Sequence, residues 1–155
     1  MGNDTQQINM KKKLISLSTG ELVSVFLFWM LMLEMKITSF AVLYNLFVNS
    51  MVLIQGAFFW FLLLRGKGRI EKPVRMVYQA FQIVDVLFLL SGVGVILFAA
   101  HRTGEKIGGL FWLLFALVEY INYFQIRLSY SGVELLLRLK EKRLQRSRIA
   151  KELKR

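Results

Sequence analysis

Residues 76–100 read MVYQAFQIVDVLFLLSGVGVILFAA, and this run of 25 residues contains one charged side chain, Asp85. A helix needs about 20 mostly apolar residues to cross the hydrocarbon core of a bilayer. The run lacks the alternation of apolar and polar residues that marks a strand of a membrane barrel. The stretch therefore predicts a transmembrane helix.

Three further stretches have the same character, at residues 14–33, 37–64 and 108–129. Gly20 and Glu21 interrupt the first of these, and the basic residues 11–13 before it are typical of a signal peptide. No small-residue cleavage site follows, since the next residues are Glu34, Met35 and Lys36. We therefore expect an uncleaved first span and an all-α polytopic membrane protein, with four transmembrane helices in an antiparallel bundle.

The composition supports this class. Of the 155 residues, 55% are hydrophobic, yet the net charge is +11. A soluble domain of this size has too little core to hide so much apolar surface. A polytopic membrane protein with basic ends accounts for both figures.

The basic residues also predict the topology. In a four-span chain, 18 of the 21 Lys and Arg residues fall on one side of the membrane, in segments 11–13 and 65–75 and beyond residue 126. Lys and Arg gather on the cytoplasmic side of membrane proteins. We expect a protein of the plasma membrane with both termini in the cytoplasm. The expected segments are a polar and basic N-terminus at 1–13, a transmembrane domain at 14–130 and a basic amphipathic helix at 131–155.

Several kinds of chemistry are excluded or disfavoured. The chain has no Cys and a single His, His101, which lies in the predicted connection 101–106. Disulfides, thiolate metal sites and bis-histidine haem binding are therefore excluded, and a His-centred triad is disfavoured. We expect no metal, no cofactor and no enzymatic activity. An intramembrane hydrolase that uses Asp85 and Glu119 as a dyad is the least favoured alternative.

Each predicted span carries a polar residue in its cytoplasmic half: Glu21, Gln55, Asp85 and Glu119. At ~1.5 Å per residue they lie roughly 10–14 Å from the cytoplasmic ends of the spans. Charged side chains at such depth generally face the interior of a bundle or water. Helical spacing places further polar residues on the same sides of these helices, in the pairs Asn45 and Asn49, Gln82 and Asp85, and Glu119 and Asn122.

Two interpretations of these residues compete. In the first, they form hydrogen bonds between helices, each worth about 0.5–2 kcal/mol. In the second, they form a proton or cation pathway made of Asp85, Glu119, Gln82, Asn122, Asn49 and Gln55. No Lys or Arg lies at matching depth, so neutral carboxylic acids are expected there at pH 7, which suits a proton relay. Glu21 carries less weight because the predicted span places it nearer the headgroups.

The C-terminal helix is expected to lie near anionic lipid headgroups, where each nearby Lys or Arg contributes ~1 kcal/mol. The residues expected to make these contacts are Arg138, Lys140, Lys142, Arg143, Arg146 and Arg148. Contact with a protein partner or a second copy is an alternative. No nucleic acid is expected, because the segment beyond Tyr130 has no aromatic side chain for base stacking.

These features favour a small non-enzymatic membrane protein that forms a homo-oligomer or serves as an accessory subunit of a membrane assembly. The alternative is a channel or transporter for protons, cations or a small solute that uses Asp85 and Glu119.

Overall fold

The structure is a computed structural model that describes the backbone of residues 2–66, 71–125, 147, 149 and 151, and the side chains of those from residue 11 onward. This part of the chain contains four helices: α1 (Gly2–Glu34), α2 (Phe40–Arg65), α3 (Lys72–Ala99) and α4 (Thr103–Phe124). Each contains a segment long and apolar enough to span a membrane. The described residues contain no strand. The all-α class and the four candidate spans are thereby confirmed.

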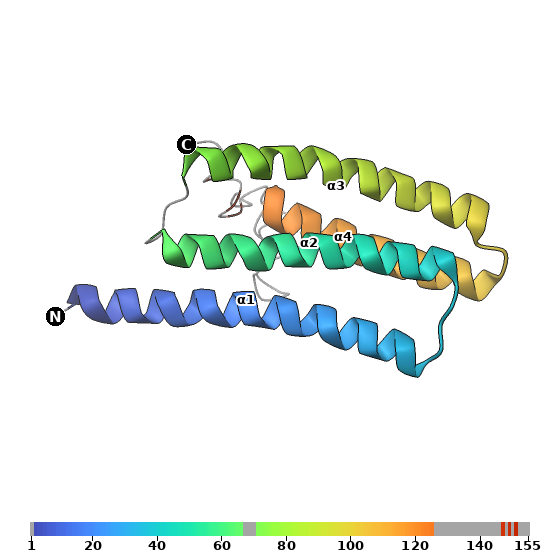
Figure 1. Ribbon diagram of the computed structural model, residues 1–155, viewed down its shortest axis with the longest axis horizontal. Coiled ribbons are helices and arrows are strands. Elements are labelled where there is room, and N and C mark those ends of the chain that lie inside the picture. Colours follow the sequence, from blue (N-terminus) through green and yellow to red (C-terminus); the bar gives the residue numbers. More distant parts are fainter. Residues whose placement is uncertain (1, 67–70, 126–146, 148, 150, 152–155) are drawn as a thin grey trace, which may run out of the picture.

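Helix α2 is the centre of the bundle. It packs against each of the other three helices, and α4 packs against both α2 and α3 (Figure 1). Its sequence suits this position, because no charged residue occurs between Phe40 and Leu64. More than half of the apolar segment of α2 is buried within the chain, whereas hardly any of the segment of α1 is.

The outer surface of the bundle is apolar. Exposed large hydrophobic side chains occur on all four helices, and Phe98 of α3 is 85% exposed. A soluble monomer rarely exposes continuous apolar surface of this kind. The arrangement is the one expected of a protein that lies in lipid.

Three helices begin earlier than the predicted segments, and α3 does so by four residues, at Lys72. Helix α1 starts at Gly2, so the polar N-terminal residues belong to the same helix as the apolar ones. Helix α4 starts at Thr103, five residues before the predicted span 108–129. The Glu105 carboxylate accepts the backbone N–H groups of His101 at 3.0 Å and of Arg102 at 3.3 Å. These bonds satisfy donors that the first turn of a helix leaves unpaired.

Part of the C-terminal segment returns to the bundle. The Ser147 hydroxyl donates to the backbone carbonyl of Tyr123, and the Ser147 N–H donates to the carbonyl of Gln125 at 3.3 Å. Ile149 is 1% exposed and belongs to the same core cluster as Leu14 and Leu63. The six predicted lipid contacts lie outside the described residues: Arg138, Lys140, Lys142, Arg143, Arg146 and Arg148.

Candidate functional site

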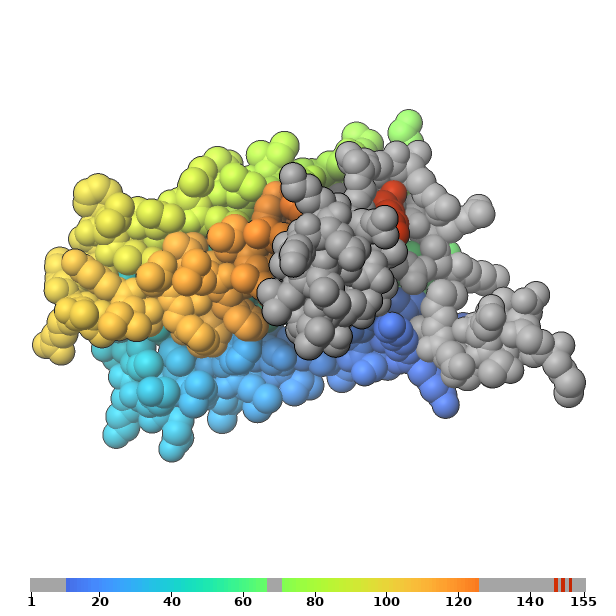
Figure 2. Space-filling model, turned by 180° about the vertical axis from the view of Figure 1, so that it is seen from behind, coloured from blue at the N-terminus to red at the C-terminus, as the bar shows by residue number. Residues whose placement is uncertain are grey.

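An open pocket of about 280 Å³ lies between α1 and α4, next to the centre of α2. Figure 2 shows the side of the molecule on which α4, in orange, lies between α1 and α3. Exposed residues of α1, among them Ser16 and Gly20, form one wall, so the pocket opens to the outside of the bundle. The complete lining is Ser16, Leu17, Gly20, Glu21 and Ser24 of α1, Leu53 of α2, and Phe115, Glu119, Asn122 and Tyr123 of α4.

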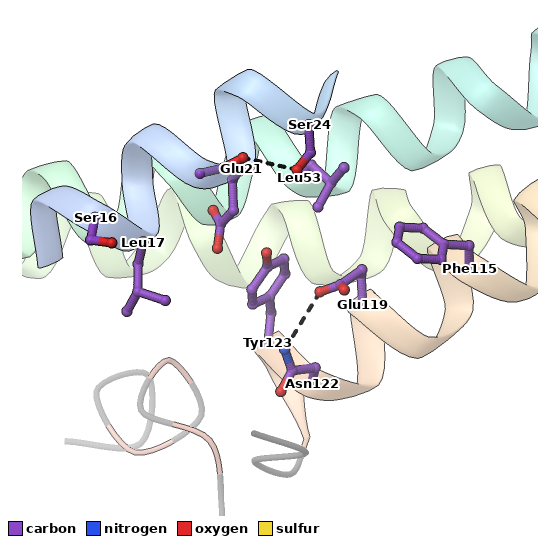
Figure 3. A pocket seen from close by; sticks show the side chains of 10 residues that line it. Ser16, Leu17, Glu21, Ser24, Leu53, Phe115, Glu119, Asn122 and Tyr123 are labelled. Atoms are coloured by element: carbon purple, nitrogen blue, oxygen red, sulfur yellow. Dashed lines mark hydrogen bonds between the residues drawn. The ribbon is translucent and has the colours of Figure 1, made fainter. Parts of the chain in front are cut away.

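Two carboxyl groups from different helices face the same tyrosine in this pocket. Tyr123 lies between Glu21 of α1 and Glu119 of α4, and its hydroxyl interacts with both carboxyl groups (Figure 3). The tyrosine is 5% exposed, so its position is set by packing. Asn122 donates from Nδ2 to Oε2 of Glu119 at 3.5 Å. Helical spacing explains this group on α4, because residues three and four positions apart share one face.

Helix α2 contacts Glu21 and Tyr123 from the side away from the pocket opening. The Trp60 indole N–H donates to Oε1 of Glu21 at 2.9 Å. Gly56 lies directly against the pair, because a Cβ atom placed on it would be 2.6 Å from a ring carbon of Tyr123 and 2.8 Å from Oε2 of Glu21. The glycine therefore provides the space in which the two side chains meet.

The pocket contains two acidic side chains and no basic residue among its described lining. No Lys, Arg or His lines it among the described residues. Two carboxyl groups in a medium of low dielectric are stable only if they hold protons or share a cation. The arrangement can therefore bind one or more protons, or a small cation that the Tyr123 oxygen and the carboxylates would surround.

A second polar group lies one residue away along α2. Gln55 donates from Nε2 to Oδ1 of Asp85 on α3 at 2.9 Å, and the Tyr78 hydroxyl donates to the backbone carbonyl of Gln55, also at 2.9 Å. Asp85 is 1% exposed. Consecutive helical residues point about 100° apart, so Gln55 faces α3 while Gly56 faces the pocket.

The six residues of the predicted pathway are thus divided. Glu119 and Asn122 line the pocket, and Asp85 and Gln55 form a separate pair. Asn49 is fully buried in the interior. The backbone carbonyl of Gln82 accepts a hydrogen bond from the Tyr120 hydroxyl of α4 at 3.5 Å. Within the described residues no hydrogen bond or charge interaction joins Asp85 to Glu119, and the carboxyl group that faces Glu119 is Glu21.

Sequence reasoning gave too little weight to two participants. Glu21 carries less weight in the sequence because the predicted span places it nearer the headgroups, yet in the structure it lines the pocket together with Glu119. Trp60 is of a type usually assigned to the membrane interface, yet its N–H is used by Glu21. The four-residue spacing of Glu119 and Tyr123 indicates that both side chains lie on one face of α4. Nothing in the sequence indicates that this face meets α1.

Within the part of the chain that the structure describes, no group of three or more Asp, Glu or His side chains is arranged to hold a metal ion. Comparison of the chain with protein-family models, with curated proteins and with solved structures finds no match. The geometry of the pocket is therefore the basis on which a function can be inferred.

Proposed function

We propose that this chain is a small non-enzymatic channel or transporter that moves protons or another small cation through the pocket of Glu21, Glu119 and Tyr123. One observation carries the proposal: two carboxyl groups from α1 and α4 face one tyrosine hydroxyl in an open pocket without a basic residue in its lining. Ionisable groups within membrane spans are costly and commonly mark ion pathways. Hydrogen bonding between helices alone would not require an open pocket around the acids.

The proposal is tested by flux into proteoliposomes that contain the purified protein. A pH-sensitive or cation-sensitive dye inside the vesicles reports entry driven by an imposed gradient. We expect Glu21→Gln and Glu119→Gln to reduce flux at least tenfold at equal protein content, because each removes one of the two carboxyl groups that can exchange a proton or bind a cation. Glu34→Gln is the matched control, since Glu34 is an exposed carboxylate at the end of the same helix as Glu21. Absence of flux for protons and for every cation tested would overturn the proposal.

The proposed orientation follows the distribution of basic residues. The four spans run antiparallel, both termini are cytoplasmic, and the protein resides in the plasma membrane. The basic C-terminal segment then faces anionic headgroups of the inner leaflet, which attract Lys and Arg. The carboxyl groups of the pocket would lie within the hydrocarbon region, some 15 Å along α1 from Lys11 at ~1.5 Å per residue.

A second candidate function is that of a subunit in a membrane assembly. The supporting observation is the isolation of α1, which packs mainly against α2 and leaves nearly all of its apolar segment uncovered. A second copy or another membrane protein that packed on α1 would enclose the open side of the pocket. Cross-linking in membranes tests this. Leu27→Cys on the uncovered face of α1 should form cross-linked dimers, whereas Leu90→Cys on the exposed face of α3 should not. A single monomeric species for both variants would contradict it.

A further inference from the structure

The interior of the bundle contains polar atoms that the protein itself does not satisfy. Among the described residues seven buried side-chain atoms have no hydrogen-bond partner. Two of them are Oε2 of Glu21 in the pocket and Nε of Arg75 near the start of α3, and the other five belong to four interior residues: Oδ1 of Asn45, Oδ1 and Nδ2 of Asn49, Oε1 of Gln55 and Oδ2 of Asp85. The four residues are 0–7% exposed. Leaving one such group unpaired costs about 1–3 kcal/mol, and lipid outside the bundle offers no replacement partner. The atoms therefore mark a buried polar region whose hydrogen bonds the described side chains leave incomplete.

Two of these atoms, Oε1 of Gln55 and Oδ2 of Asp85, would be paired by one added proton. Gln55 already donates from Nε2 to Oδ1 of Asp85 at 2.9 Å. The two atoms left over in this pair, Oε1 of Gln55 and Oδ2 of Asp85, are both acceptors when the carboxyl group is ionised, so they cannot bond to each other. A proton on Oδ2 turns it into a donor, and Oε1 of Gln55 is the unpaired acceptor on the residue that already bonds to the same carboxyl group.

The surroundings of Asp85 agree with a neutral acid. Its one polar neighbour across the helix interface is Gln55 of α2, and no charged group of the described residues interacts with it. The acids of the pocket, Glu21 and Glu119, interact with Tyr123 of α4, and the pocket lies against a different face of α2 from the one that carries Gln55. A buried carboxylate without a counter-charge is far more costly than a buried neutral acid.

Two asparagines nearer the start of α2 carry the other unpaired interior atoms. Asn45 and Asn49 lie one helical turn apart, and Asn45 is ten residues, or ~15 Å, from Gln55 in the direction of the start of the helix. Asn45 uses its Nδ2 on the carbonyl of Ala41 at 2.8 Å. Its Oδ1 and both amide atoms of Asn49 are left, a set of donors and acceptors that suits ordered water.

We propose that Asp85 and Gln55 form a buried proton-binding site, and that water held by Asn49 and Asn45 links this site to the end of the bundle where α2 begins. A proton delivered through this water forms the O–H bond of Asp85, and its release to water restores the carboxylate; no other bond changes. The inference deepens the proposed function and rests on it in one respect, since it names the proton as the transported species. The binding site itself stands on the geometry of Asp85 and Gln55.

Infrared spectroscopy of the purified protein in lipid tests the binding site without transport. We expect a protonated-carboxyl band at neutral pH that shifts in heavy water and contains a component that disappears in Asp85→Asn, an isosteric variant that stays neutral. Glu21→Gln and Glu119→Gln should retain the band. Gln55→Leu should move it to higher frequency, because the acid carbonyl loses its N–H donor. A wild-type spectrum without the band, or a band unchanged by Asp85→Asn, would overturn the site.

Proton uptake by proteoliposomes tests the water path. Asn49→Leu replaces the amide with an apolar group of similar volume, and we expect it to slow proton uptake at least tenfold while the infrared band of Asp85 persists. Unchanged uptake would overturn the path. The two proposals fail in different ways. An infrared band in a protein that moves no cation refutes transport and supports the proton site. Flux of a metal cation in a protein without the band supports transport and refutes the proton site.

Discussion

Tyr123 and Gly56 together determine whether the pocket can exist. The tyrosine interacts with the carboxyl groups of Glu21 and Glu119, and the glycine lies where any larger residue would meet both Tyr123 and Glu21. A pocket acid from α1 and another from α4 can therefore approach the same hydroxyl only because α2 has no side chain at this position. The same principle applies at Gly92 of α3, where an added Cβ would collide with Oδ1 of Asn45.

Gly56→Ala should destabilise the protein and separate the acidic pair. The new methyl group would be 2.6 and 2.7 Å from ring carbons of Tyr123, and overpacking of this kind costs about 1–3 kcal/mol. Gly94→Ala is the control, because nothing lies within 4 Å of a Cβ there and Ala favours a helix over Gly. Thermal unfolding in lipid nanodiscs measures both. Equal melting temperatures for the two variants would contradict the close approach at Gly56.

Ile149→Ala tests whether the C-terminal residues contribute to the bundle. Ile149 is 1% exposed in the core cluster that includes Leu63, and shortening a buried Ile to Ala costs about 2–5 kcal/mol. We expect a clear loss of thermal stability. Lys151→Ala changes an exposed side chain two residues away and should leave the melting temperature unchanged. Identical behaviour of both variants would show that Ile149 adds nothing to stability.

At the scale of the helices, apolar length could be recognised from the sequence, whereas helix ends and helix rotation could not. Runs such as 76–100 identify a span because bilayer thickness sets a length requirement. The pairing of Asp85 with Gln55, and of Glu119 with Glu21, depends on how each helix is turned about its axis against its neighbours. Spacing within a helix shows which residues share a face, but it does not say which helix that face meets.

The N-terminus of α4 shows how a helix end depends on local hydrogen bonds. The sequence suggested a connection over 101–106, but Glu105 accepts the N–H groups of His101 and Arg102 and the helix begins at Thr103. Glu105→Ala should therefore speed amide hydrogen exchange over residues 101–106. Lys106→Ala, an exposed neighbour, should leave the exchange rates unchanged. Equal protection in both variants would mean that the carboxylate does not hold the first turn.

At the scale of the whole molecule, the apolar surface suits contact with lipid, and the basic ends favour one orientation of the chain across the membrane. The uncovered faces of α1, α3 and α4 suit lipid, and the basic segments orient the chain across it. The polar groups occupy the interior around the centre of α2, where Gln55 and Gly56 face different neighbours. This division separates the acids that open to the pocket from the acid that is buried between α2 and α3.

The orientation can be measured with single-cysteine variants, because the natural chain contains no Cys and any label must react at the introduced one. Thr38 and His101 lie in the connections that the basic-residue pattern places outside, whereas Lys11 and Glu71 lie on the side with most of the basic residues; all four are exposed. In intact cells a membrane-impermeant maleimide should label Thr38→Cys and His101→Cys. Lys11→Cys and Glu71→Cys should react only after permeabilisation, since Lys12 and Lys13 still hold the N-terminal segment on the cytoplasmic side. Labelling of Thr38→Cys and Glu71→Cys from the same side would mean that α2 does not cross the membrane, and the pocket acids would then lie outside the hydrocarbon region.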